Sequence, residues 1–166
     1  MVVWLIGISG AGKTTLGNKI KEYYDSNNIN SFILDGDLVR DFYDNDLGFS
    51  KEDRVANIKR IMLAAYVLEQ NGIIPIVCNI SPFENLRNFA RKKFNNYNEI
   101  FLHKDLTVAQ SNDVKGVYKN NLEQTALVGI NMVFEEPKNT NLVIEVDKED
   151  IETSFKKIID YLGRNE

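Results

Sequence analysis

Cysteine, histidine and proline are scarce in this sequence. Its 166 residues include one cysteine, Cys78, one histidine, His103, and three prolines. A single cysteine cannot form an intramolecular disulfide, and one cysteine with one histidine does not make a zinc cluster. We therefore expect both residues to be structural, and we place the protein in a reducing compartment, the cytoplasm.

Excess positive charge and long hydrophobic runs are also missing. Twenty Lys and Arg against 24 Asp and Glu give a formal net charge of -4, so no global basic field holds nucleic acid. The N-terminal apolar run at residues 2–6 ends at Gly7 and is too short for a membrane span or a signal peptide. We expect no nucleic-acid and no membrane partner, so any anion must be bound locally.

Short apolar runs alternate with helical periodicity along the chain, which is typical of an α/β fold. The pattern predicts strands at residues 2–6, 31–34, 73–78, 99–102 and 142–146, and helices at 13–24, 51–70, 83–94 and 149–162, with a short helix after Asp37. Periodicity is weak between residues 112 and 141, where we expect a lid. The prediction is one domain over residues 1–166, a parallel five-stranded sheet flanked by helices.

A P-loop pattern lies between the first predicted strand and the first helix. Residues 7–14 read Gly, four residues, Gly, Lys, Thr, and such glycines let backbone N–H groups curl around a phosphate at a helix N-terminus. Lys13 can neutralise β- and γ-phosphates, and the Thr14 hydroxyl can ligate Mg²⁺. A plain glycine turn would leave Lys13 and Thr14 unexplained, and a dinucleotide fingerprint would put its third glycine on Thr15. The pattern predicts a fold of the P-loop nucleoside triphosphate hydrolase class, with the triphosphate bound by Gly7, Ser9, Gly10, Ala11, Gly12, Lys13, Thr14 and Thr15.

A P-loop alone does not separate a nucleotide-dependent switch from a phosphotransferase. No Asn-Lys-x-Asp segment for binding guanine occurs late in the chain, so the switch remains the non-enzymatic alternative. Asp35 and Asp37 follow the second predicted strand, at the sheet edge where α/β folds bind ligands. One carboxylate could accept a proton from an attacking hydroxyl while the other orients metal or water. A solvated Asp-Gly turn is an equal alternative on these residues alone.

Further polar side chains are expected to face the same crevice. Arg40 follows the two carboxylates, and Arg54 and Asn57 lie three residues apart on one face of the long predicted helix. Asn79 and Ser81 follow the third strand. The alternatives are a solvated helix face for the arginines and a helix N-cap for Ser81.

These segments together resemble the adenylylsulfate kinase family over about residues 2–137. Beside the P-loop, the matching segments are residues 34–37, 39–40, 46–50, 53–54, 57–58, 80–83 and 113–119. The resemblance implies a homodimeric kinase that uses MgATP to phosphorylate the ribose 3′-hydroxyl of a small-molecule nucleotide acceptor. That acceptor carries a mixed anhydride at its 5′ end.

The resemblance also implies roles for individual residues. Asp37 would be the base for the 3′-hydroxyl, Asp35 would support metal or water, and Lys13 would stabilise the phosphates. Phe49 would stack on the acceptor's base. The other residues implied in acceptor binding are Arg40, Arg54, Asn57, Asn79, Ile80 and Ser81, with Lys115 in the lid.

The sequence departs from the family pattern at several positions. Leu38 and Asn112 replace the usual Asn and Arg, and the stretch between residues 118 and 129 is shorter. A family segment Phe-Thr-Gly-Ile-Asp, whose Phe stacks on adenine, begins here with Leu127. Losing one stacking face costs of the order of 1–3 kcal/mol per base. We therefore expect the acceptor of a known family variant from capsule modification, cytidine 5′-diphosphoramidate, with adenylylsulfate as the alternative.

Overall fold

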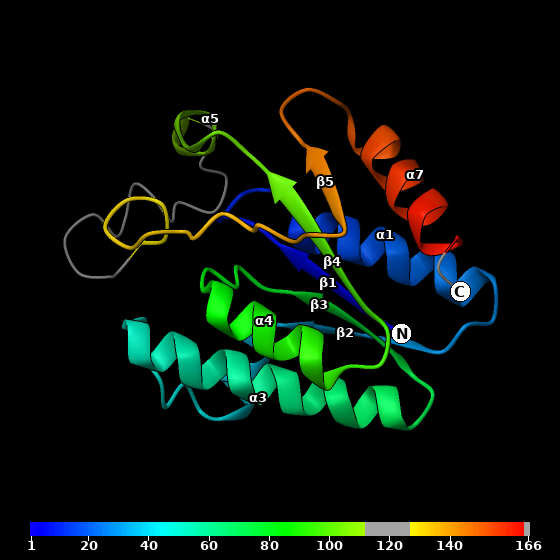
Figure 1. The fold of residues 1–166 in the computed structure, drawn as a ribbon, viewed down its shortest axis with the longest axis horizontal. Coiled ribbons are helices and arrows are strands. Elements are labelled where there is room, and N and C mark those ends of the chain that lie inside the picture. The colour runs from blue at the N-terminus through cyan, green and yellow to red at the C-terminus, as the bar shows by residue number, and fades with distance from the viewer. Residues whose placement is uncertain (112–126, 165–166) are drawn as a thin grey trace.

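The chain folds around a parallel β-sheet (Figure 1). A computed structural model describes residues 1–111 and 127–164. The strands pair in the order β2-β3-β1-β4-β5, and every pair is parallel. Their bounds are β1 (Val2–Ile6), β2 (Ser31–Asp35), β3 (Ile74–Cys78), β4 (Tyr97–His103) and β5 (Leu142–Glu145).

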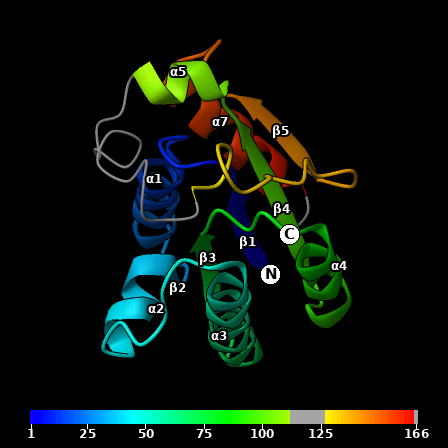
Figure 2. The same cartoon turned by 90° about the vertical axis from the view of Figure 1, so that its left-hand side faces the viewer.

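Helices cover both faces of this sheet (Figures 1 and 2). On one face α1 (Lys13–Ser26) packs against β2 and β3 and touches α7 (Ile151–Leu162). On the other face α3 (Lys51–Gln70) packs against the same two strands and touches α4 (Glu84–Lys93). The short α2 (Gly36–Phe42) packs on α3, and α5 (Leu106–Ser111) follows β4.

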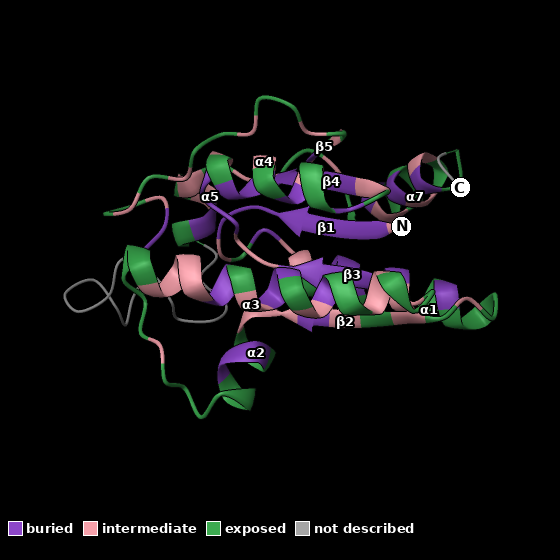
Figure 3. Cartoon of the chain, turned by 60° about the horizontal axis from the view of Figure 1, so that its bottom comes forward, coloured by how far each residue is buried: buried purple, intermediate pink, exposed green. Residues whose placement is uncertain are grey.

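The buried side chains form two cores because successive strand residues point to opposite faces. In β1, Val3 and Leu5 join the core that contains residues of α1 and α7. Val2, Trp4 and Ile6 join the core that contains residues of α3 and α4. All of β1 is buried (Figure 3), which explains its uninterrupted apolar run.

The predicted fold class is confirmed, and differences are confined to element ends and one short helix. The prediction missed α5 and the polar beginning of β4, residues 97–98, where Tyr97 and Asn98 interrupt the apolar run. The helix predicted at residues 51–70 has those bounds, and Gly72 just after it adopts φ 72°. Most of the predicted lid, residues 112–126, lies outside the described residues. Within the two described stretches, no helix has the length and apolar character needed to cross a membrane.

Gly17 allows α1 to lie directly on β3, and this contact gives a stability test. A Cβ at Gly17 would lie 2.4 Å from Cys78 Sγ. We expect Gly17→Ala to lower the free energy of unfolding by about 1–3 kcal/mol through overpacking, measured by urea denaturation. In a Cys78→Ala background the same change should cost much less, because the sulfur is gone. An equal cost in both backgrounds would contradict the contact.

Candidate active site

The segments that follow β1, β2 and β3 leave the sheet at one edge. Asp35 at the end of β2 pairs with Cys78 at the end of β3, and Cys78 pairs with Leu5 in β1. The N–H of Gly7 donates to the carbonyl of Ile80 at 3.4 Å, which joins the P-loop to the segment after β3. Parallel pairing thus assembles groups from distant parts of the sequence at one crevice.

The P-loop has the backbone conformation of a phosphate cradle. Gly7 and Gly12 adopt φ 145° and 87°, and a Cβ at Gly7 would lie 2.5 Å from the carbonyl oxygen of Leu102. Gly12 precedes α1 as its N-cap and has no side chain to cap it, so the helix presents backbone N–H groups to an anion. Lys13 Nζ donates to the carbonyls of Gly7 at 2.9 Å and Ile8 at 2.7 Å. This places the ammonium across the start of the loop.

The remaining predicted phosphate-loop residues lie around the same turn. Gly10 adopts φ 77°, and Ala11 is buried in the core. Ser9 is half-buried, while Thr14 and Thr15 are exposed in the first turn of α1. The exposed Thr14 hydroxyl fits a Mg²⁺ site of the kind in which phosphate oxygens and water supply most ligands. Among the described residues there is no cluster of three or more His, Cys, Asp or Glu that could hold a metal.

Cys78 lies beneath the cradle and is structural, as predicted. Its Sγ lies 3.3 Å from the carbonyl of Lys13 and donates to it. Burial raises the pKa of the thiol to about 12, while the Lys13 ammonium opposes the rise. The thiol is therefore protonated and unreactive at neutral pH.

The two aspartates at the β2–α2 junction have different surroundings. Asp35 accepts from Leu38 N at 2.7 Å and caps α2. It therefore has a structural role, as the Asp-Gly turn alternative expected. Asp37, in the first helical turn, is exposed. Asn57 Nδ2 donates to the Gly36 carbonyl at 3.2 Å, whereas its buried Oδ1 has no hydrogen-bond partner among the described residues. The junction therefore offers one carboxylate and one amide oxygen to a ligand.

Two guanidinium groups lie close to the ring of Phe49. Arg40 and Arg54 place Cζ 4.6 Å and 5.4 Å from the ring centroid. Arg40 donates to the carbonyls of Leu47 and Gly48 at 2.9 and 2.7 Å, and Arg54 Nε donates to that of Phe49 at 3.1 Å. Burial lowers the pKa of both arginines, and for Arg54 the neighbouring Arg40 adds to the effect. Arg40 is only 7% exposed, so the solvated-face alternative is wrong for it.

Ser81 has a strained backbone and a buried hydroxyl. Its φ is 47°, and its side chain accepts from Trp4 Nε1 at 2.9 Å and donates to Asn79 Oδ1 at 3.0 Å. Asn79 Oδ1 also accepts from Ser81 N at 2.9 Å. The N-cap alternative for Ser81 is wrong, because Phe83 holds that position in α4. The hydroxyl thus belongs to a buried network, and its predicted contact with the acceptor stays a prediction.

Leu127 lies in a tight turn and is buried. Its carbonyl accepts from Met132 N at 3.0 Å, and Gly129 N donates to the Met132 carbonyl at 2.7 Å. Leu127 belongs to the same core cluster as Ile8 and Ala109. Lys115, predicted for the lid, lies outside the described residues.

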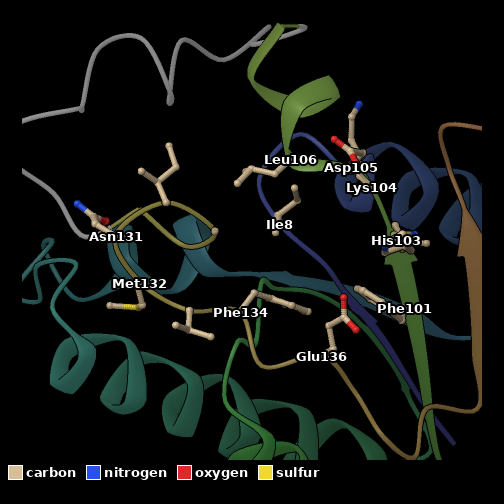
Figure 4. A pocket seen from close by; sticks show the side chains of 14 residues that line it. Ile8, Phe101, His103, Lys104, Asp105, Leu106, Asn131, Met132, Phe134 and Glu136 are labelled. Carbon is tan, nitrogen blue, oxygen red and sulfur yellow. The ribbon is translucent and has the colours of Figure 1, made fainter.

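A pocket of about 510 Å³ opens at the end of β4 (Figure 4). It was not predicted from the sequence. Phe101 and Phe134 stack within it with ring centroids 5.5 Å apart, and His103 pairs with Glu145 at 2.8 Å. Its lining comprises Ile8, residues 101–106, residues 129–134 and Glu136. The aromatic pair joins residues far apart in sequence, so no local pattern could have indicated it.

Comparison with known proteins identifies relatives along nearly the whole chain. A sequence model described as adenylylsulphate kinase matches residues 1–145. An adenylyl-sulfate kinase of Halothermothrix orenii is 38% identical over 164 residues, covering 98% of this chain and 89% of the relative. One from Rippkaea orientalis is 39% identical over 160 residues, covering 95% and 88%.

Solved structures agree with this similarity. The Mycobacterium tuberculosis APS kinase CysC in complex with AMPPNP and APS superposes with a TM-score of 0.90 at 32% identity, covering 98% of this chain and 96% of that one. A hexameric APS kinase from Thiobacillus denitrificans gives 0.73 at 25% identity, covering 98% and 28%.

The raised pKa of Cys78 gives a chemical test of the cradle. At pH 8 a disulfide reagent such as Ellman's reagent should label native protein at least about a hundred times more slowly than urea-unfolded protein, because reaction needs an exposed thiolate. The measurement is the absorbance of released thionitrobenzoate over time. Comparable rates in the two states would contradict the buried, protonated thiol.

Proposed function

Because the chain belongs to the adenylylsulfate kinase family and is an ATP-dependent phosphotransferase, we propose that it phosphorylates the ribose 3′-hydroxyl of adenylylsulfate. The observation that carries this proposal is the family match over residues 1–145, which spans the P-loop and the acceptor groups. Relatives named for adenylylsulfate favour it over cytidine 5′-diphosphoramidate, the acceptor expected from Leu127. The product would be 3′-phosphoadenylylsulfate.

The donor is held at the cradle. The N–H groups at the start of α1 and the Lys13 ammonium would bind the β- and γ-phosphates of ATP. Thr14 would hold Mg²⁺, which offsets negative charge on these phosphates when it is bound. The backbone of the loop is already formed, so the main reorganisation on binding is at Lys13, whose ammonium would exchange the Gly7 and Ile8 carbonyls for phosphate oxygens.

The acceptor is activated at the β2–α2 junction. Asp37, exposed in the first turn of α2, would take the proton of the 3′-hydroxyl as the oxygen attacks the γ-phosphorus. The bond between the γ-phosphorus and the bridging oxygen breaks, and ADP leaves with that electron pair. Asp35 caps α2 and so fixes the start of the helix whose first turn carries Asp37.

Phe49 and its two arginines suit the rest of the acceptor. Phe49 is 44% exposed, which leaves part of its surface available to a base. Arg40 and Arg54 supply positive charge beside it for the anhydride. Leu127, buried in the core, provides no second aromatic face for the base, which predicts weaker adenine binding than a pair of aromatic rings would provide.

Assembly and extent are proposals of the same kind. We propose one kinase domain over residues 1–166 that acts in the cytoplasm, with a lid at about residues 112–141. A homodimer is the assembly implied by the sequence resemblance. Sedimentation velocity would distinguish it from a hexamer like that of the Thiobacillus denitrificans protein.

The acceptor is tested by ATP consumption with Mg²⁺ and either adenylylsulfate or cytidine 5′-diphosphoramidate, with products identified by phosphorus NMR. We expect adenylylsulfate to give the higher kcat/KM and a new 3′-phosphate resonance. Preference for the cytidine compound would instead support the acceptor that we expected from Leu127. ATP hydrolysis that neither nucleotide accelerates would favour the nucleotide-dependent switch.

Replacing Asp37 tests the proposed base. Asp37→Asn keeps the size of the side chain but removes its proton affinity, so kcat should fall by about 10²–10⁴-fold while the Kd for ATP stays nearly unchanged. Asp41→Asn is the matched control, since Asp41 is an exposed carboxylate on the same helix. Turnover of Asp37→Asn close to that of the control would rule out the base assignment.

A further inference from the structure

Helix α4 is capped by a residue from a distant part of the chain. Its N-cap position is Phe83, whose side chain cannot accept a hydrogen bond. The carboxylate of Glu135 accepts from Glu84 N at 2.6 Å instead, and Glu135 N donates to the Pro82 carbonyl at 2.9 Å. Glu135 thus supplies the N-terminal cap that the local sequence lacks. It lies in what we call the return segment, residues 127–136.

One buried guanidinium completes this connection. Arg87 is 1% exposed, and its two terminal nitrogens donate to the Ser81 carbonyl at 2.7 Å and the Glu135 carbonyl at 2.5 Å. The nitrogen that donates to Glu135, Arg87 Nη2, also donates to Glu84 Oε2 at 2.5 Å. The planar fork fixes the directions of all these bonds at once. Arg87 therefore joins the loop after β3 to the return segment.

Both joined segments carry residues that were predicted to contact the acceptor. The loop after β3 contains Asn79 and Ser81, and the strained φ of Ser81 requires support from its neighbours. The return segment begins at Leu127 and includes Phe134, whose ring lies 5.7 Å from Arg87 Cζ. Holding the two segments together therefore fixes the distance between these two sides of the predicted acceptor site.

The charge of Arg87 is balanced without any ligand. Arg87 and Arg91 face Glu84 and Glu99, and Glu99 is fully buried. Burial raises the pKa of Glu99 while the two arginines oppose the rise. Substrate charge is therefore not needed to hold Arg87 in place, which suits a structural anchor and not a substrate ligand.

We propose that Arg87 and Glu135 are positioning residues that set the acceptor site by fixing the return segment against the loop after β3. The proposal rests on the proposed function for the identity of the acceptor. The hydrogen bonds of Arg87 and Glu135 run to residues 81–84 and to each other. The P-loop meets the loop after β3 through the 3.4 Å bond from Gly7 N to the Ile80 carbonyl, so donor binding should be affected much less than acceptor binding.

The chain contains a built-in reporter of this linkage. Trp4 is the sole tryptophan, and its indole N–H donates to Ser81 Oγ at 2.9 Å. A shift of the loop after β3 should change the emission maximum and the near-ultraviolet circular dichroism of Trp4. This readout needs neither substrate nor turnover.

The test compares Arg87→Lys and Glu135→Leu with Glu135→Gln and Arg91→Lys. Glu135→Gln keeps an oxygen for Glu84 N and should behave like the unaltered protein. Arg91→Lys is the matched control, because Arg91 bonds Glu84 and Glu99 in the same cluster. Glu135 is exposed, so Glu135→Leu should fold even where substitution of the buried Arg87 prevents folding.

We expect Arg87→Lys and Glu135→Leu to raise the acceptor KM about tenfold, shift the Trp4 signal and leave the ATP KM within about twofold. The proposal is overturned if the ATP KM rises equally, if Arg91→Lys has the same effect, or if the Trp4 signal of Glu135→Leu is unchanged. If the unaltered protein turns over neither nucleotide, the proposed function is refuted. The Trp4 signal would still test the linkage in that case.

Discussion

The candidate site depends on the parallel pairing of β1 with β3 and β4. Because all five strands run parallel around β1, the segments that follow them leave the sheet at one edge. The groups of the site come from distant parts of the sequence, and this edge is where they meet. The pairing is stable because β1 is buried on both faces, with Val3 and Trp4 in opposite cores. Hydrophobic burial along five residues thus fixes the position of a polar site that lies beyond them.

At that edge the donor and acceptor groups are held by different means. The cradle consists mainly of backbone, shaped by left-handed glycines and closed by the contacts of Lys13 with two carbonyls. The acceptor groups are side chains, and each is oriented by another: Phe49 by Arg40 and Arg54, Ser81 by Trp4 and Asn79. A backbone site tolerates sequence change outside its glycines, whereas a side-chain site changes with each substitution. This difference suits a fixed donor and an acceptor that can vary.

Much of the fold and part of the site followed from the sequence. Strands and the P-loop were predictable because periodicity and glycine spacing are local, and the helix at residues 51–70 begins at a Ser50 cap and ends before Gly72. The cap that Glu135 provides for α4 and the stacking of Phe101 on Phe134 were not predictable, since each joins residues more than thirty positions apart. Ser81 shows the same limit: its position after a strand was evident, but its bond to Trp4 depends on the packing of β1 beside β3.

Gly7 illustrates how a motif residue can serve two requirements. Its missing side chain is demanded by β4, because a Cβ would collide with the Leu102 carbonyl whether or not a nucleotide is present. Lys13 is under no such packing demand. A descendant of this chain that lost nucleotide binding would therefore be expected to keep glycine at position 7 long after position 13 had diverged. Loss of the lysine before the glycine would indicate that packing of the sheet constrains position 7 for longer than nucleotide binding does.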